Sequence, residues 1–193
     1  MFIRRHLAAL PALTAAAVIS IAPHASAHAR HSCRYANTPV IGARRSQIRA
    51  AVLCLINQQR TRHHLPPVRE SASLDRSAQS WTNTMVASGR FTHGRNFAAR
   101  ITAAGFNWSA AGENIATGFA TPRDVVTAWM ASTGHCRNIL DPTFAEVGTG
   151  VSPHRVGHVR GAPATWTQDF GLRQGHKPPS GNHGPANGCP YHI

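Results

Sequence analysis

The sequence predicts an α+β fold in which helices and a β-sheet pack in layers around one core. Segments with the apolar period of a helix dominate from residue 46 to residue 130, and β-rich segments separated by turn residues dominate from residue 146 to residue 171. The 193 residues, of which 42% are hydrophobic, suffice for one domain and are too few for two of ordinary size. Helices first and strands last are typical of α+β folds.

The first predicted helix starts at Ser46. Its apolar residues recur at the spacing i, i+4, i+7 and i+8, which places them on one helical face: Ile48, Val52, Leu55 and Ile56. The helix is expected to end before Pro66 and Pro67, because proline lacks the backbone N–H that a helix needs.

Three further helical segments follow. Ser73 is a suitable N-cap for a second helix, and Gly89 is a plausible stop. A shorter piece covers "NFAARITAAG" and ends near Gly105. Thr121 and Asp124 form a T-x-x-D capping box around Pro122 at the start of a fourth helix. The apolar faces of these three helices consist of Leu74, Ala78, Trp81 and Met85; Phe97 and Ile101; and Val125, Val126, Trp129 and Met130.

The remaining regular structure is predicted to be β-strand. "GENIATG", "EVGTGV", "RVGHVR" and "ATWTQDFG" are rich in β-formers and are bounded by turn residues, which indicates an antiparallel meander. Residues 172–193 are rich in Gly, Pro, His and Asn and read as a tail that only a disulfide would tether.

The N-terminus has the organisation of a secretory signal peptide. Arg4 and Arg5 precede the apolar run "LAALPALTAAAVISIA", and small residues lead to a cleavage site near Ala27. The run is too short for a good membrane span. We therefore predict a signal peptide at residues 1–27, a polar leader at 28–45, and a protein that is secreted or held in the cell envelope.

The chain is strongly basic, with a formal net charge of +13. Nearly all of this charge is arginine, and Lys177 is the only lysine. The charge fits either a solvated surface or attraction to anionic cell-wall polymers and lipid headgroups, which would allow peripheral contact with a membrane. No helix-turn-helix pattern, zinc-finger spacing or basic run with interleaved aromatics points to specific binding of nucleic acid.

An even number of cysteines in an exported chain predicts disulfides. Four cysteines allow three pairings, of which we favour Cys33–Cys54, because the two are close in sequence, together with Cys136–Cys189, which would tether the tail. Cys136 follows His135 directly, so the pair reads as a nucleophile with its base, as two metal ligands, or as two residues with separate roles.

The common catalytic patterns are absent: there is no H-E-x-x-H, no G-x-S-x-G, no Walker loop and no C-x-x-C. Cys189 and His192 have the spacing of half a zinc site, with no second half evident. Glu113 and Glu146 stand in apolar or Gly-rich segments, where a buried carboxylate requires a cationic or hydrogen-bonding partner. Among thirteen histidines, His93 and His135 stand out because each lies among small residues after a predicted helix.

Six segments occur in the order seen in bacterial members of the CAP superfamily, which includes cysteine-rich secretory proteins, antigen 5 and plant pathogenesis-related proteins. They are "LINQQRTRHHLPP", "FTHG", "AAGENIA", "VVTAWMASTGHCRNIL", "FAEVGTGV" and "WTQDFG". The resemblance covers residues 46–171. It implies a three-layer α-β-α sandwich with a central antiparallel sheet, and a cleft of two histidines and two acids where a divalent metal, often zinc, binds.

The resemblance also suggests which residues line the cleft. His93 and His135 match the cleft histidines, Glu113 matches the first acid, and Glu146 matches an acid that bacterial relatives often carry. The glutamate that many eukaryotic relatives place just after the tryptophan is missing after Trp129. Two histidines would bind zinc or another divalent metal weakly, since a closed structural site uses four ligands, and the carboxylates would orient the imidazoles. If no metal binds, the contacts between these two histidines and two glutamates would only stabilise the fold of the cleft.

The leading hypothesis is a secreted binding or interaction module, expected to be monomeric, rather than an enzyme. Ligands of the superfamily include sterols, other lipids and proteins, and the sequence selects none of them. The alternative is a metal-dependent hydrolase, protease-like or esterase-like, with Glu113 or Glu146 as the base. A third hypothesis is a wall-associated protein that works through its basic surface. In all of them Cys136 is expected to fix the loop that carries His135.

Overall fold

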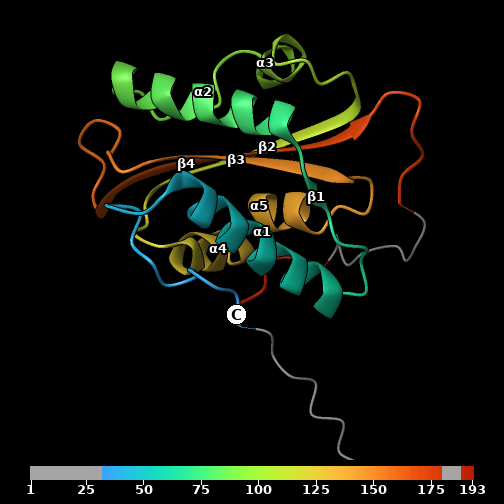
Figure 1. Ribbon diagram of the computed structural model, residues 1–193, viewed down its shortest axis with the longest axis horizontal. Coiled ribbons are helices and arrows are strands. Elements are labelled where there is room, and N and C mark those ends of the chain that lie inside the picture. The colour runs from blue at the N-terminus through green and yellow to red at the C-terminus, as the bar shows by residue number, and fades with distance from the viewer. Residues whose placement is uncertain (1–31, 180–187) are drawn as a thin grey trace, which may run out of the picture. The chain divides into compact units, whose positions relative to one another are not determined.

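The computed structural model describes residues 32–179 and 188–193. The predicted signal peptide and the start of the leader lie outside the described residues. Ser32–Ile193 form one unit, drawn in Figure 1, with a sheet between two layers of helices. Helices α2 (Ala72–Ser88) and α3 (Phe97–Ala103) cover one face. Helices α1 (Arg45–Arg62), α4 (Pro122–Met130) and α5 (Thr133–Ile139) cover the other. The predicted three-layer α+β sandwich is therefore confirmed.

Local sequence explains where the helices begin and end. Helix α2 starts at Ala72, one residue before the predicted cap, and Gly89 ends it with a left-handed φ of 65°. The Asn96 side chain accepts a hydrogen bond from the Ala99 N–H at the start of α3. At α4 the hydroxyl of Thr121 accepts one from the Asp124 N–H, which is one of the two bonds of the predicted capping box.

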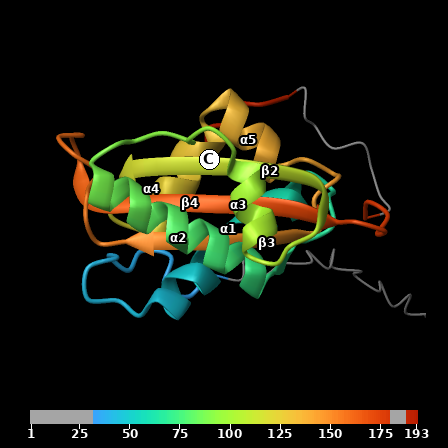
Figure 2. The same cartoon turned by 90° about the horizontal axis from the view of Figure 1, so that it is seen from above.

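The sheet has the strand order β1-β3-β4-β2. Strand β4 (Ala162–Arg173) pairs antiparallel with both β2 (Trp108–Gly118) and β3 (Glu146–Ser152). The predicted antiparallel pairing is confirmed, but the predicted meander is wrong, because β4 lies between β2 and β3. Strand β1 (Arg69–Glu70), which the sequence did not indicate, adds a short parallel pair with β3, so the sheet is mixed. Figure 2 shows α2 and α3 lying across one face of these strands.

The strand predicted at "RVGHVR" is wrong, because residues 155–160 form part of the connection between β3 and β4. Val156 is fully buried there against Met85 and Ile115, so its apolar side chain belongs to a loop that packs on the end of α2. Gly157 follows with a positive φ of 51°, which interrupts extended backbone.

The largest core cluster lies between the sheet and the layer of α1, α4 and α5. Its bulkiest members are Trp129 and Trp166, which are fully buried, together with Phe144 and Phe170. The two phenylalanine rings stack with their centroids 5.4 Å apart. Separate small clusters under α2 and α3 centre on Leu74, Ile101 and Phe106 and on Met85, Ile115 and Val156. Because helices cover both faces of the sheet, the central strand β4 is buried without interruption from Ala164 to Leu172.

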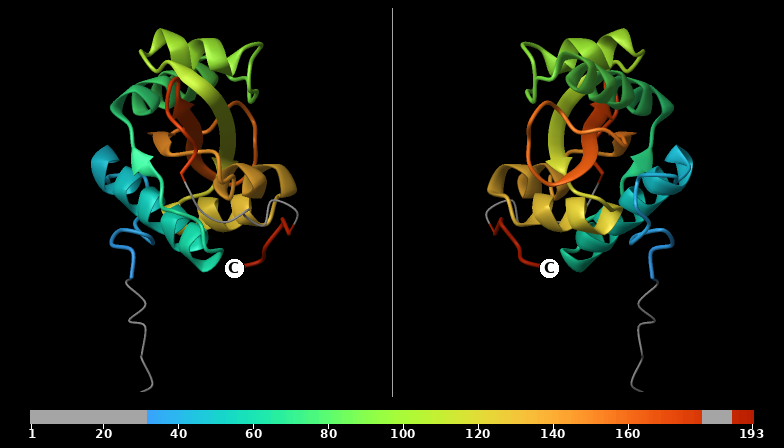
Figure 3. Two further views of the ribbon diagram at one scale, coloured as in Figure 1. Left: turned by 90° about the vertical axis from the view of Figure 1, so that its right-hand side faces the viewer. Right: turned by 90° about the vertical axis from the view of Figure 1, so that its left-hand side faces the viewer.

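Both predicted disulfides are confirmed: Cys33 bonds to Cys54, and Cys136 bonds to Cys189. The part of the predicted leader from Ser32 on is packed, since Cys33, Ala36 and Val40 are buried in the main core. Residues 188–193 run beside α4 and α5 (Figure 3), where the Tyr191 N–H donates to the carbonyl of Met130 at 2.8 Å. No helix among the described residues is long and apolar enough to cross a membrane.

Candidate functional site

The turn between α2 and α3 carries His93 and is held by two long side chains. The Trp81 indole N–H donates to the carbonyl of Thr92 at 2.9 Å, and Arg100 Nη1 donates to the carbonyl of His93 at 3.0 Å. Gly94 has a left-handed φ of +70°, and an added Cβ there would come within 2.8 Å of the Trp81 ring. The sequence "THG" therefore allows the backbone to pass directly over Trp81 while it presents His93.

Glu113, on the edge strand β2, fixes the orientation of His93. Its side chain is only 1% exposed, and its Oε1 lies 2.8 Å from His93 Nδ1. Arg100 Nη2 donates to the other oxygen, Oε2. Because a carboxylate accepts hydrogen bonds, this contact favours the His93 tautomer with the proton on Nδ1, which leaves a lone pair on Nε2. The His93 ring is half exposed, so this lone pair is accessible.

His135 reaches the same region from the opposite helical layer. It lies on α5, which asparagines attach to β2: Asn138 Nδ2 donates to the side-chain oxygen of Asn114 at 2.8 Å and to the carbonyl of Glu113 at 3.1 Å. Asn114 Nδ2 in turn donates to the carbonyl of His135 at 3.3 Å. The segment that carries His135 is therefore a helix, and the expectation of a loop is wrong.

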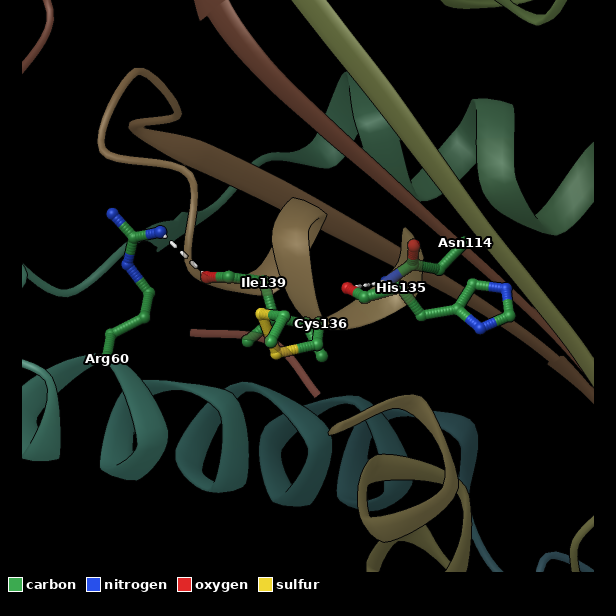
Figure 4. The surroundings of a disulfide bond; sticks show 6 residues. Arg60, Asn114, His135, Cys136 and Ile139 are labelled. Atoms are coloured by element: carbon green, nitrogen blue, oxygen red, sulfur yellow. Dashed lines mark hydrogen bonds between the residues drawn. A yellow bond between two sulfur atoms is a disulfide. The ribbon is translucent and has the colours of Figure 1, made fainter. Parts of the chain in front are cut away.

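Figure 4 shows the side chains of His135 and Cys136 pointing in different directions. Successive residues of a helix differ by about 100° in direction. Cys136 is fully buried in the main core and bonded to Cys189, whereas the half-buried His135 lies on the side of β2. No described cysteine is a free thiol. The adjacent pair is thus two residues with separate roles.

The two histidines are close enough to interact electrostatically. Burial, and secondarily the nearby His93, lower the pKa of His135 below its usual value. Both effects favour the neutral imidazole. We refer to His93, Glu113 and His135 together as the histidine site.

A second acid, Asp169, lies behind Glu113 and was not predicted. The two residues are paired across β2 and β4, and Asp169 is 1% exposed. Neither of its oxygens meets a partner at full hydrogen-bond geometry among the described residues, although the Ser77 hydroxyl and the Glu113 carboxylate lie close enough to affect its pKa. Burial and the Glu113 carboxylate raise the pKa of Asp169 well above its usual value. The surroundings of Asp169, at the back of the histidine site, therefore favour its protonated form.

The structure places the other predicted acid apart from these residues. Glu146 begins β3 and forms a two-pronged ion pair with Arg173, with N–O distances of 2.9 and 3.2 Å. No contact joins it to His93, Glu113 or His135 among the described interactions. The four predicted residues thus divide into a group of three and an isolated Glu146.

The donor set fits an open metal site and does not fit a closed one. His93 Nε2 and the His135 imidazole, whose pKa is lowered by burial, are the candidate donors, and a carboxylate bonded to the second nitrogen of a histidine is the usual support of a metal ligand. No group of three or more His, Cys, Asp or Glu side chains is arranged to hold an ion within the described part of the chain. Two imidazoles would leave at least two positions of a tetrahedral ion open.

Arg100 and Asp169 are the site residues that sequence reasoning missed. A cation was expected near Glu113, and Arg100 is the arginine of the helical segment just before that strand, but the period of α3 alone does not show where its guanidinium reaches. Asp169 stands in "WTQDFG", an acid within an apolar strand, which is the same signal that identified Glu113.

Comparison with known proteins identifies the family. Residues 53–170 match the sequence profile of the CAP family, described as the cysteine-rich secretory protein family. A Bacillus subtilis protein described as "Uncharacterized protein YkwD" is 36% identical over 124 residues, which cover 62% of this chain and 45% of the relative. The match therefore spans less than half the length of that relative.

Solved structures show the same fold at lower sequence identity. One is an extracellular protein containing a SCP domain from Bacillus anthracis, with a TM-score of 0.56, 21% identity, and coverage of 68% of this chain and 44% of the other. Another is an outer surface protein from Borrelia burgdorferi, with a TM-score of 0.56, 18% identity, and coverage of 64% of this chain and 90% of the other. Profile and fold agree, and the chain belongs to the CAP, or cysteine-rich secretory protein, family.

Proposed function

We propose that this chain is an extracellular binding module in which His93 and His135 hold a divalent cation, such as zinc, that presents open positions to a ligand. Two disulfides support an oxidising, extracellular location, because cytosolic thiols are normally kept reduced. The printed descriptions of two fold relatives, an extracellular protein and an outer surface protein, agree with that location. The ligand would be an oxygen-bearing group of a lipid, polymer or protein.

The bond between His93 and Glu113 is the observation that carries this proposal. It selects the tautomer whose Nε2 is free, and the carboxylate makes that nitrogen more basic. Because Arg100 compensates the buried carboxylate, the arrangement persists without metal. The cation would therefore bind to a prepared pair of imidazoles and would not be needed for folding.

The same contacts favour binding over hydrolysis. A general base must be free to take a proton from water, and both oxygens of Glu113 are already engaged, by His93 and by Arg100. Glu146, the other base considered, is paired with Arg173. The hydrolase alternative therefore lacks an available carboxylate at the histidine site.

Isothermal titration of the oxidised protein with zinc tests the cation part. We expect the wild type to bind one equivalent of zinc, and His93→Ala and His135→Ala each to abolish zinc binding. Glu113→Gln should weaken the zinc affinity by ~10–100-fold, because the hydrogen bond that supports His93 is lost. His158→Ala removes an exposed histidine elsewhere and is the matched control. Zinc binding that is unchanged in His93→Ala plus His135→Ala would contradict the proposal.

A turnover assay separates the two functions. Peptide, ester and cell-wall substrates are incubated with the zinc-loaded protein and with Glu113→Gln. The binding function predicts no turnover by either protein. Hydrolysis by the wild type that Glu113→Gln abolishes, with the fold retained, would assign the enzyme instead.

A further inference from the structure

A pocket lies where β1 pairs with β3, near the C-terminal end of β4. Its volume is about 370 Å³, within the ~300–1,000 Å³ range of small-molecule sites. It shares no lining residue with the histidine site. Its walls include Pro67, Leu172 and Pro179, and its charged residues are Arg69, Glu146, Arg173 and Lys177.

The charges of this pocket are unbalanced. Two arginines and one lysine line the pocket together with one carboxylate, so its lining has two more basic than acidic side chains. Arg173 is the cation that is neutralised, through its paired bonds to Glu146. Within the described residues, no side-chain hydrogen bond or ion pair engages Arg69 or Lys177, which is the only lysine of the chain.

The geometry of the pocket is fixed by Arg173. Its guanidinium is held by Glu146 and lies 4.3 Å from the centre of the Phe106 ring. Arg69 pairs with Glu146 in the parallel register of β1 and β3, so backbone pairing places Arg69 beside this ion pair. Lys177 comes from the segment that follows β4. Basic side chains from three separate segments therefore border one pocket, and two contacts hold Arg173 in place.

We propose that this pocket binds a ligand bearing a phosphate group. The guanidinium of Arg69 offers a planar pair of donors that matches phosphate oxygens, and Lys177 adds a mobile point charge. The apolar walls would accommodate the carbon part of a phosphoester. The site is independent of the cation proposed at the histidines, so either proposal can fail without the other.

The single lysine provides a direct assay. The oxidised protein is treated with an amine-acylating reagent in amine-free and phosphate-free buffer, and the rate of Lys177 modification is followed by peptide mass spectrometry. The probes are inorganic phosphate, glycerol phosphate, and acetate at equal ionic strength. A further arm uses phosphatidylglycerol vesicles, which distinguish a lipid headgroup from a soluble phosphoester.

We expect phosphate and glycerol phosphate, but not acetate, to slow the acylation of Lys177. Arg69→Gln should raise the concentration needed for half-protection by roughly tenfold, the loss of one charge-assisted contact. Arg155→Gln removes an exposed arginine from the connection after β3 and should leave protection unchanged. Added protection by vesicles would identify the lipid headgroup as one source of the phosphate.

Three results would overturn the proposal. The first is no protection by any soluble phosphate, whether or not vesicles protect. The second is equal protection by acetate, which would indicate general screening of charge. The third is that Arg155→Gln weakens the protection of Lys177 as much as Arg69→Gln does. Thermal unfolding of each variant shows whether its fold is intact.

Discussion

At the scale of single residues, Glu113 organises the candidate site. Its carboxylate accepts from His93 and Arg100, while Asp169 lies across the strand pair behind it. Two buried acids side by side cannot both ionise cheaply, so one keeps its proton. Arg100 and His93 both contact the Glu113 carboxylate, and the raised pKa is that of Asp169.

This arrangement predicts how Asp169→Asn changes stability with pH. The pKa of Asp169 is higher in the folded protein than in the unfolded chain, so its stabilising contribution is full below the unfolded value and is lost as pH rises through the folded value. Asparagine does not titrate. The variant should therefore gain stability relative to wild type as pH rises above about 4, the value of an unperturbed aspartate, by up to ~1.4 kcal/mol per pH unit until the folded-state pKa is passed.

Urea unfolding of both proteins across this pH range measures the difference. The exposed Asp124→Asn on α4 is the control and should show no such gain. A stability difference between wild type and Asp169→Asn that stays constant with pH would show that Asp169 does not hold its proton.

Much of the histidine site could be predicted from sequence, because three of its residues sit in short ordered segments that resemble the family. What sequence could not provide is the set of partners. Glu146 was expected beside the histidines, yet Arg173, two residues beyond its cross-strand neighbour Gly171, pairs with it instead. Such contacts depend on register, which the strand pattern alone leaves undetermined.

At the scale of elements, the close approach of α2 to β3 determines where the helix lies. Strand β3 presents Gly148 and Gly150 to α2, and a Cβ added at Gly148 would come within 2.1 Å of the backbone of Leu74. The same helix carries Trp81, which supports the turn that holds His93. The glycines in "EVGTGV" therefore set the position of the histidine site indirectly.

Gly148→Ala should destabilise the protein by several kcal/mol, because the helix backbone must move away from the strand. Gly134→Ala is the matched control. It lies in α5 with nothing within 4 Å of the added methyl group, so it should be neutral or stabilise by up to about 1 kcal/mol. Thermal or urea unfolding measures both, and a Gly148→Ala protein as stable as wild type would contradict this packing.

Helix α5 was not predicted because seven residues containing a glycine give no apolar period. Tertiary contacts hold it instead. The buried Arg60 donates to the carbonyls of Ile139 and Asp141 at 2.9 Å, and burial lowers the pKa of Arg60 to about 10. Figure 4 shows Arg60 reaching the end of the helix beyond Cys136.

The disulfide of α5 should contribute more to the free energy of unfolding than the N-terminal disulfide. Cys136 and Cys189 are 53 residues apart, whereas Cys33 and Cys54 are 21 apart. The chain-entropy relation gives about 4 and about 3 kcal/mol for loops of these lengths. Urea unfolding of the two double-serine variants should rank them in this order. The opposite order would show that strain or residual structure outweighs loop closure.

At the scale of the whole molecule, helices on both faces and two disulfides enclose a buried sheet, and the edge strand β2 lies between the two helical layers that supply the histidines. His93 approaches from the layer of α2 and α3, and His135 from the layer of α4 and α5. The layered fold was predictable, since apolar periods and capping residues are local signals. That the two layers bring these histidines together was suggested only by the family resemblance, because their sequence separation carries no such signal.

The central claim is that His93 and His135 form a prepared cation site, and long-range proton–nitrogen NMR of the histidine rings tests it most directly. Without metal, His93 should show the tautomer protonated at Nδ1. One equivalent of zinc should shift ring nitrogens of both His93 and His135 while the exposed His158 stays unchanged. Zinc that shifts only other histidines, or a His93 ring protonated at Nε2, would contradict the account.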